Sequence, residues 1–471
     1  MQYRTKVMVV YIMVVFMTVI DGTMVNVALP TLADEFGVAS TDIEWIAVGY
    51  LLSFAAIIPV AGWLGDRFGT RRIFILALIL FVGVSIMCGL SQSLEQLVAL
   101  RVVQGLGGGL LTPIGSAMLF RAFPLEDRAT AAIGVLSVAV IAPATGPLIG
   151  GILVDEASWR WIFFINGPIG VAALVLAVIW LKEEVHERPG RFDVAGFVLS
   201  VVAVTVLLYT LSTAPERGWL ATGTIALTAI SLGAGIALIV VELHVPDPML
   251  ALRLYRDRLF RTINLASTTM YAGFFGLIFV LPLYMQTLRG FSAFESGLAL
   301  SPQAVGVFLV ANLFGHRLYR TIGPRRLMIV GSTLTAIITC SYALTGLDTP
   351  LWVIGLISLA RGLSVGLVFV SIQTAVYATT SLADTGRATS LFTAQRQLSY
   401  AVGVALAATV ITTRLNAVGG DAAPADDRLQ AYQWGFVACG LLMVPSACAS
   451  WFVHDADVSA TRGLEPVVAA R

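Results

Sequence analysis

Long apolar runs recur along the whole chain, each of 18 or more residues and each separated from the next by a short polar stretch. A helix needs about 20 such residues to cross the hydrocarbon core of a bilayer. We place fourteen runs, near residues 8–30, 43–61, 73–91, 96–119, 130–153, 161–181, 194–213, 222–242, 262–287, 297–315, 326–346, 351–374, 391–413 and 432–453. Barrel strands would alternate in polarity every second residue. The sequence therefore predicts an all-α integral membrane protein with fourteen transmembrane helices.

Composition supports this prediction and leaves no room for a soluble domain. Hydrophobic residues make up 58% of the 471 residues and charged residues only 12%, whereas soluble domains carry about 25% charged residues. The net charge of +1 gives no sign of a nucleic-acid partner. The four cysteines all lie in apolar runs without CxxC spacing, so we expect neither a disulfide framework nor a metal framework.

Positive charges predict the orientation, because Lys and Arg gather in the cytoplasmic loops of membrane proteins. With the N-terminus in the cytoplasm, 21 of the 29 Lys and Arg residues fall on that side. Five fall on the other side, and three lie in or at the ends of spans. An even number of spans returns the C-terminus to the cytoplasm. We therefore expect a multi-pass plasma-membrane protein with both termini inside.

Two pairs of segments repeat between the halves of the chain. GWLGDRFGTRR (62–72) links the second and third spans, and GHRLYRTIGPRR (315–326) links the tenth and eleventh. RVVQGLGGGL (101–110) opens the fourth span, and ARGLSVGL (360–367) lies in the twelfth. Each pair has the same place in a six-helix half if the seventh and eighth spans are an added pair. Parallel six-helix repeats with a binding site between them are typical of secondary transporters.

This repeat predicts four parts of the chain. They are an N-terminal six-helix bundle at 1–185, an inserted two-helix hairpin with flanking loops at 186–251, a C-terminal six-helix bundle at 252–454 and a cytoplasmic tail at 455–471. A non-transporting membrane receptor is the alternative from another functional class. A receptor is expected to carry a soluble sensor or signalling domain, and no loop is long enough for one.

The repeated segments also carry a family resemblance. The loop at 62–72 is similar to the pattern G-x-L-a-D-r-x-G-r-k of the major facilitator superfamily, with Thr70 where a basic residue is usual. LVALRVVQGLGGG (97–109) matches the fourth-helix pattern of that family closely. The second half of the chain matches less well, and its loop at 315–326 lacks the aspartate.

Three further segments narrow the resemblance to the fourteen-helix drug:proton antiporter subfamily. ATGPLIGGIL (144–153) resembles the fifth-helix antiporter pattern, and IDGTMVNVALP (20–30) and WRWIFFINGPIG (159–170) resemble segments of the first and sixth helices. The resemblance implies a proton-coupled secondary active transporter that exports lipophilic, cationic or neutral small molecules or drugs by alternating access. A narrow exporter of one metabolite, lipid or siderophore is the alternative within transport.

Asp21 lies near the middle of the first predicted span, where inserting a charge costs about 2.5–3.5 kcal/mol. One interpretation is structural, with the carboxylate paired to an arginine or a backbone donor on a neighbouring helix. The other is functional, with the carboxylate facing a central cavity, where it exchanges a proton near neutral pH or attracts a lipophilic cation. On the functional interpretation, Asp21→Asn removes a buried charge and should insert at least as well as the native chain.

Arg101 is the expected helper of Asp21, because an arginine one turn into a span needs a carboxylate, carbonyl or water partner. Snorkelling of its side chain to the outer interface is the alternative. Gln104 lies three residues further on and shares the same helix face. The resemblance assigns the position of Arg101 to proton-coupled exchange. Arg361 and Arg396 receive less weight, since both can simply anchor the ends of spans.

Two glycine-containing segments complete the predicted site. A conformational latch is expected from the loop residues Gly62, Asp66, Arg67, Gly69, Arg71 and Arg72. A tight loop needs glycine for positive φ, and an aspartate at a helix terminus can pair with a basic residue or a helix N-terminus on a moving neighbour. Bending or close packing of the fifth helix is expected from Gly146, Pro147, Gly150 and Gly151.

Enzyme chemistry finds no support in the sequence. A P-loop needs Gly-Lys, but the only lysines follow Thr5 and Leu181, so we expect no use of ATP. GLSVG (362–366) fits G-x-S-x-G formally, but it lies in an apolar helix rather than a strand–turn–helix. The four histidines are scattered. We expect no catalytic residue, metal or cofactor, and a monomer whose partners are protons, a small-molecule substrate and the bilayer.

Overall fold

The computed structural model describes the chain except residues 39, 184–189, 246–247, 382–383 and 460–471. Its described part contains helices and no strands. Helices are the expected outcome for continuous apolar runs, because a segment in lipid must satisfy its own backbone hydrogen bonds.

Helices lie on all fourteen predicted ranges. The first six ranges correspond to α1 (Tyr3–Phe36), α3 (Trp45–Phe68), α4 (Thr70–Gly89), α5 (Leu94–Ala122), α6 (Arg128–Glu156) and the consecutive α7 (Arg160–Phe164) and α8 (Asn166–Trp180), with a short α2 (Ser40–Ile43) before α3. The next two are α9 (Val194–Arg217) and α10 (Thr222–His244). The last six are α11 (Arg258–Leu283), α12 (Ala293–Leu309), α14 (Pro324–Ser341), α15 (Leu351–Ala375), α16 (Thr385–Val418) and the consecutive α17 (Ala425–Leu441) and α18 (Val444–Ser450), with a short α13 (His316–Ile322) before α14.

Thirteen helical segments of the described residues are long and apolar enough to cross a membrane. They cover thirteen of the fourteen predicted spans. The remaining span, 130–153, lies on α6, which has 29 residues but is not one of the thirteen. The count of fourteen therefore stays a prediction.

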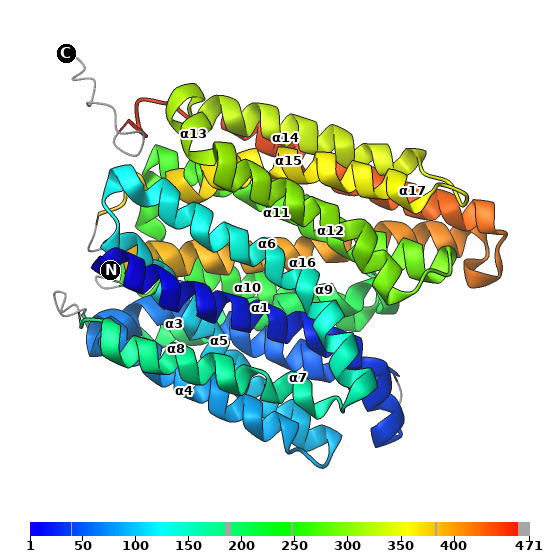
Figure 1. The fold of residues 1–471 in the computed structure, drawn as a ribbon, viewed down its shortest axis with the longest axis horizontal. Coiled ribbons are helices and arrows are strands. Elements are labelled where there is room, and N and C mark those ends of the chain that lie inside the picture. Colours follow the sequence, from blue (N-terminus) through cyan, green and yellow to red (C-terminus); the bar gives the residue numbers. More distant parts are fainter. Residues whose placement is uncertain (39, 184–189, 246–247, 382–383, 460–471) are drawn as a thin grey trace.

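The helices form two groups that lie side by side (Figure 1). In the first group, α1 packs on α6 and α8, and α5 packs on α3 and α4. In the second group, α11 packs on α16 and α18, and α12 and α14 pack on α15. The hairpin helix α9 packs against α10, α3 and α16, so it contacts both groups. The exact boundaries of the four predicted parts stay predictions.

The two loops that echo each other in sequence are built in the same way. Gly69 joins α3 to α4 with φ +98°, and Gly323 joins α13 to α14 with φ +88°. A Cβ on either glycine would lie within 3 Å of a carboxylate, that of Glu183 after α8 or that of Asp455 after α18. Each carboxylate accepts a hydrogen bond from the backbone N–H of the second residue of the following helix, where an anion is favoured by the helix dipole. The echo in sequence is therefore also an echo in structure.

The first residue of α1 and the last described residue of the chain lie at the same end of the molecule, here called the terminal end (Figure 1). The opposite end is the far end. One apolar cluster spans both groups in the terminal half and includes Tyr11 and Tyr377. Two separate clusters fill the far half, one around Trp159 in the first group and one around Phe436 in the second. Among the described residues, the groups therefore share an apolar core in the terminal half and pack independently in the far half.

Hydrogen bonds reinforce this contact between the groups. Arg128, at the start of α6, is 1% exposed and donates from Nη1 to the carbonyl oxygen of Tyr377 at 2.7 Å. Thr389 of α16 donates from Oγ1 to the carbonyl oxygen of Pro113 at 3.1 Å. The oxygen of Tyr377 lies just after α15 and that of Pro113 lies within α5. Without these acceptors, the buried donors of Arg128 and Thr389 would be unpaired at a cost in stability. The terminal end is therefore closed in this conformation.

The predicted orientation can be checked at the turn of the α9–α10 hairpin, where Leu220 is 90% exposed. In a chain with its four native cysteines replaced by alanine, Leu220→Cys should react with a membrane-impermeant maleimide in intact cells. Arg256→Cys, exposed between α10 and α11, should react only after permeabilisation, because the positive-inside distribution places it in the cytoplasm. The reverse pattern of labelling would contradict the topology.

Candidate functional site

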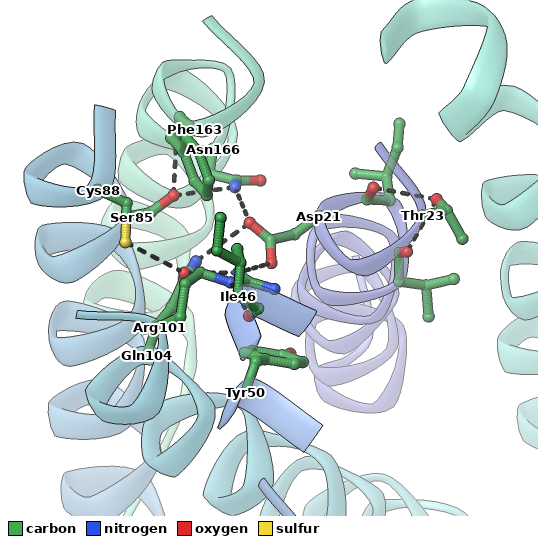
Figure 2. Close-up of polar contacts among 12 residues, drawn as sticks. Asp21, Thr23, Ile46, Tyr50, Ser85, Cys88, Arg101, Gln104, Phe163 and Asn166 are labelled. Atoms are coloured by element: carbon green, nitrogen blue, oxygen red, sulfur yellow. Dashed lines mark hydrogen bonds and ion pairs between the residues drawn. The ribbon is translucent and has the colours of Figure 1, made fainter. Parts of the chain in front are cut away.

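Asp21 lies in the middle of α1 and is fully buried inside the first group (Figure 2). Its Oδ2 accepts a hydrogen bond from Arg101 Nη1 at 2.7 Å, which is also an ion pair. Its Oδ1 accepts from Gln104 Nε2 at 3.1 Å and from Asn166 Nδ2 at 2.7 Å. Three helices, α1, α5 and α8, therefore meet at one carboxylate. The three predicted residues Asp21, Arg101 and Gln104 lie in a single cluster.

The guanidinium of Arg101 points into the first group rather than snorkelling to an interface. It is 1% exposed, and its Nη1 also donates to Gln104 Oε1 at 2.7 Å. Its Nε donates to the carbonyl oxygen of Ile46 at 3.4 Å. The ring of Tyr50 lies 4.2 Å from the guanidinium carbon, within the range of a cation–π contact. The cation is thus surrounded by acceptors and an aromatic face.

Asn166 is a member of this cluster that the sequence analysis missed. It is the first residue of α8 and is fully buried. Besides Asp21, its Nδ2 donates to Ser85 Oγ at 3.0 Å, and Ser85 Oγ donates to the carbonyl oxygen of Phe163 at 3.0 Å. The available signal was that Asn166 is the one polar residue in the apolar run 161–181. The segment's resemblance to the family's sixth helix did not by itself assign Asn166 a role.

The geometry changes what is expected of Asp21 in two ways. Its partners all belong to the first group, and it is fully buried, so in this conformation it does not open onto a central cavity. Its charge is also compensated by Arg101. Removing one member of a buried ion pair leaves the other charge unpaired, at a cost of about 3–5 kcal/mol. Asp21→Asn should therefore destabilise the protein, in contrast to the expectation from sequence.

Within the predicted latch, Gly62 and Asp66 reach the second group. Asp66 Oδ1 accepts a hydrogen bond from Arg121 Nη2 of α5 at 3.2 Å, and both side chains are largely buried. A Cβ on Gly386, the second residue of α16, would lie 3.2 Å from that nitrogen and 3.5 Å from Asp66 Oδ1. A Cβ on Gly62 would lie 3.1 Å from the carbonyl oxygen of Gly386. The pair therefore sits against the N-terminus of α16.

Arg71 and Arg72 of the predicted latch instead make their contacts within the first group. The carboxylate of Glu183 accepts from the backbone N–H groups of Arg71 at 3.1 Å and Arg72 at 3.2 Å. Arg71 Nη2 also donates to the carbonyl oxygen of Val178 at 2.8 Å, while Arg67 is exposed. These contacts join the α3–α4 turn to the end of α8. Sequence reasoning did not single out Glu183, because its partner lies more than 100 positions away in the chain.

The glycines of α6 differ in their surroundings. A Cβ on Gly146 would lie 2.0 Å from Thr23 Oγ1, and a Cβ on Gly150 would lie 3.2 Å from the Cα of Met24. These two glycines therefore allow α6 to approach α1 closely. Gly151 has no such neighbour within 4 Å. The α6 helix continues past Pro147, whose side chain lies outside the described residues.

Arg361 has the position in α15 that Arg101 has in α5. It is 0% exposed, so its interpretation as the anchor of a span end is wrong. It donates to Thr339 Oγ1 at 3.1 Å, to the carbonyl oxygen of Phe274 at 3.2 Å and to Gln303 Oε1. These acceptors are neutral, and no ion pair of the described residues includes Arg361. The two halves thus bury equivalent arginines with different compensation.

In the described part of the chain, two helix groups share a core at one end only and one group holds a buried ion pair. This is the architecture of a secondary transporter. The sequence profile described as Major Facilitator Superfamily matches residues 11–404 and 263–465. This chain belongs to that family, as its motifs predicted, and is therefore a transporter and not an enzyme.

Relatives of known name support the same assignment. The chain is 32% identical over 403 residues to the Multidrug resistance protein B homolog of Mycobacterium tuberculosis (strain ATCC 25618 / H37Rv), covering 84% of this chain and 74% of that protein. It is 30% identical over 456 residues to the Putative multidrug resistance protein MdtD of Cronobacter sakazakii, covering 94% and 93%. The crystal structure of the human organic anion transporter MFSD10 is similar with a TM-score of 0.69 over 93% of this chain and 99% of that one. At 14% identity, that likeness shows the fold alone.

The buried ion pair predicts strong energetic coupling between Asp21 and Arg101. Asp21→Asn and Arg101→Gln should each lower stability by about 3–5 kcal/mol, because each leaves one buried charge unpaired. The double variant removes both charges and should recover most of that loss. The apparent unfolding midpoints of the native protein, the two single variants and the double variant together form a double-mutant cycle, which measures the coupling.

The exposed pair of Arg160 and Glu35, with an N–O distance of 3.0 Å, provides the control. The same cycle of Glu35→Gln and Arg160→Gln should give a coupling of about 1 kcal/mol or less, since both side chains are partly solvated. Simple addition of the two losses at Asp21 and Arg101 would contradict the coupling.

Proposed function

We propose that this chain is a proton-coupled antiporter that exports lipophilic small molecules across the plasma membrane by alternating access. The observation that carries the proposal is closure of the two helix groups against each other in the terminal half only. With both termini in the cytoplasm, as the positive charges predict, this conformation is closed toward the cytoplasm. Relatives named as multidrug resistance proteins favour drugs and similar compounds as substrates.

The cluster around Asp21 favours proton coupling because it can accommodate two protonation states. The carboxylate accepts from Arg101, Gln104 and Asn166. A proton on Asp21 would abolish the attraction to Arg101 and turn one carboxylate oxygen into a donor. Asn166 Oδ1 has no hydrogen-bond partner among the described residues, so a rotated amide can accept from the protonated acid. Protonation thus weakens the junction of α1 with α5 and offers a two-state element.

The charge compensation of Asp21 also bears on the substrate. Attraction of lipophilic cations was expected on the basis of a carboxylate that faces a central cavity. In the closed cluster, Arg101 neutralises that charge, so Asp21 has no remaining attraction for a cationic substrate. The proposal therefore assigns Asp21 to protons and leaves substrate binding to the interface between the groups.

Proteoliposomes with an imposed pH gradient test the coupling. The native protein should accumulate a fluorescent lipophilic compound against its own gradient. The double variant Asp21→Asn, Arg101→Gln keeps the charges balanced, so it should fold, yet it has lost the titrating group. We expect its pH-driven accumulation to fall to the level of empty liposomes while downhill exchange persists.

The double variant Glu35→Gln, Arg160→Gln serves as the matched control and should retain pH-driven accumulation. Absence of accumulation by the native protein would refute the antiport proposal. Full accumulation by the Asp21, Arg101 double variant would leave antiport standing and remove Asp21 from it.

We further propose that Asp66 and Arg121 act as the latch, by holding a negative charge against the N-terminus of α16. Asp66→Asn should slow transport about two- to fivefold through loss of a charge–dipole contact of up to about 1 kcal/mol. Asp127 makes an ion pair with Arg4 within the first group at the same end, so Asp127→Asn is the control and should leave transport nearly unchanged. Equal loss of transport and of folded yield in Asp66→Asn would mean that Asp66 is only structural.

A further inference from the structure

A small cavity lies between the two helix groups, and its lining comes from both. Tyr11 and Ser116 line it from α1 and α5 of the first group, while Tyr377, Phe392 and Arg396 line it from the second group. Its volume is about 20 Å³, enough for a water molecule. Its walls belong to both groups, so the alternating access proposed above would widen the cavity when the terminal end opens.

Arg396 is the charged residue of this cavity. It lies in α16 and is partly buried, and no acidic side chain is among the described residues that line the cavity. None of the ion pairs of the described residues includes Arg396. The neutral phenol of Tyr271 lies near it. A cation in apolar surroundings without a counter-charge is costly. The buried aspartate of the first group, Asp21, pairs with Arg101 and not with Arg396.

Hydroxyl groups and aromatic rings surround this cation. The hydroxyl of Tyr11 donates to the carbonyl oxygen of Thr112 at 3.0 Å, and the side chains of Ser116 and Tyr377 line the same cavity. The ring of Phe392 lies 5.9 Å from that of Tyr377 and 6.3 Å from that of Tyr271, measured between centroids. Apolar walls with a few convergent polar groups are typical of small-molecule sites.

We propose that Arg396 is a substrate-binding residue and that the transported compounds are aromatic, lipophilic molecules that carry one oxyanion, such as a carboxylate or sulfonate. This inference rests on the proposed function, because it names the substrate class of the same pathway. An oxyanion compensates the guanidinium and forms charge-assisted hydrogen bonds with it. The aromatic body packs against the rings, and a cationic analogue meets a like charge.

The first test compares three compounds that share one aromatic body and differ in charge: 1-pyrenebutyrate, 1-pyrenebutanol and 4-(1-pyrenyl)butyltrimethylammonium. Binding is measured by equilibrium dialysis with the native protein in nanodiscs of zwitterionic lipid, whose headgroups carry no net charge. Binding to empty nanodiscs is subtracted. We expect the carboxylate to bind about tenfold or more tightly than the ammonium compound, since a charge-assisted hydrogen bond is strong in an apolar site. Equal or tighter binding of the ammonium compound would overturn the proposal.

The second test changes Arg396 itself. Arg396→Gln should weaken binding of pyrenebutyrate about tenfold and leave pyrenebutanol within about twofold, because only the charged contact is lost. Arg396→Lys keeps the charge and should retain the preference for the anion. Arg414→Gln makes the same substitution at an exposed position of α16 and should behave like the native protein. Equal weakening of all three compounds, or unchanged binding of pyrenebutyrate, in Arg396→Gln would refute a binding role.

Binding without a pH gradient separates this inference from the proposed function. If the native protein shows no preference for the anionic compound, the proposed substrate class is refuted even if proton-driven transport is found. Failure of proton-driven transport refutes antiport even if the anion preference depends on Arg396 as expected.

Discussion

The cost of holding a charge in an apolar, low-dielectric interior governs where this protein places its ionised groups. Asp21 and Arg101 meet that cost together, at 2.7 Å and with amide donors on the remaining carboxylate oxygen. The pair joins α1 to α5, and Asn166 extends the junction to α8. The packing of the first group therefore depends on this charge balance. If Asp21 carries the proton, as proposed, the same ion pair is both a structural contact and the coupling site.

The same requirement is met differently in the second group, although the two halves share their loop architecture. The turns at Gly69 and Gly323 use the same positive φ and the same carboxylate at the following helix N-terminus. Arg361, in contrast, has only neutral acceptors among the described residues. The two halves thus share the glycine turn and its carboxylate, whereas among the described residues a buried carboxylate accompanies the buried arginine in the first group and not in the second. This asymmetry is consistent with the proposal that a single cluster, on one side of the interface, responds to protons.

Fold class followed from sequence because it depends on a local property, the length of each apolar run. The pairing of Asp21 with Arg101 was also within reach, since a buried charge requires a partner and the sequence contains few candidates. Asn166 and Glu183 were missed because their partners lie more than 100 positions away, and no local pattern encodes which helices become neighbours. Arg361 was misjudged for a related reason. Its distance from the end of an apolar run does not reveal how deeply the surrounding helices bury it.

Asp21 and Arg101, the two compensated charges, lie on helices that also line the cavity next to Arg396. On α1, Tyr11 lines the cavity between the groups while Asp21 lies ten residues further on, about 15 Å along the helix. On α5, Ser116 lines that cavity while Arg101 holds Asp21. A change in the ion pair that shifts α1 against α5 therefore also moves the hydroxyls that face Arg396. If Asp21 carries the proton and Arg396 binds substrate, as proposed, coupling between them requires no further connecting element, because the continuous helices α1 and α5 carry residues of both sites.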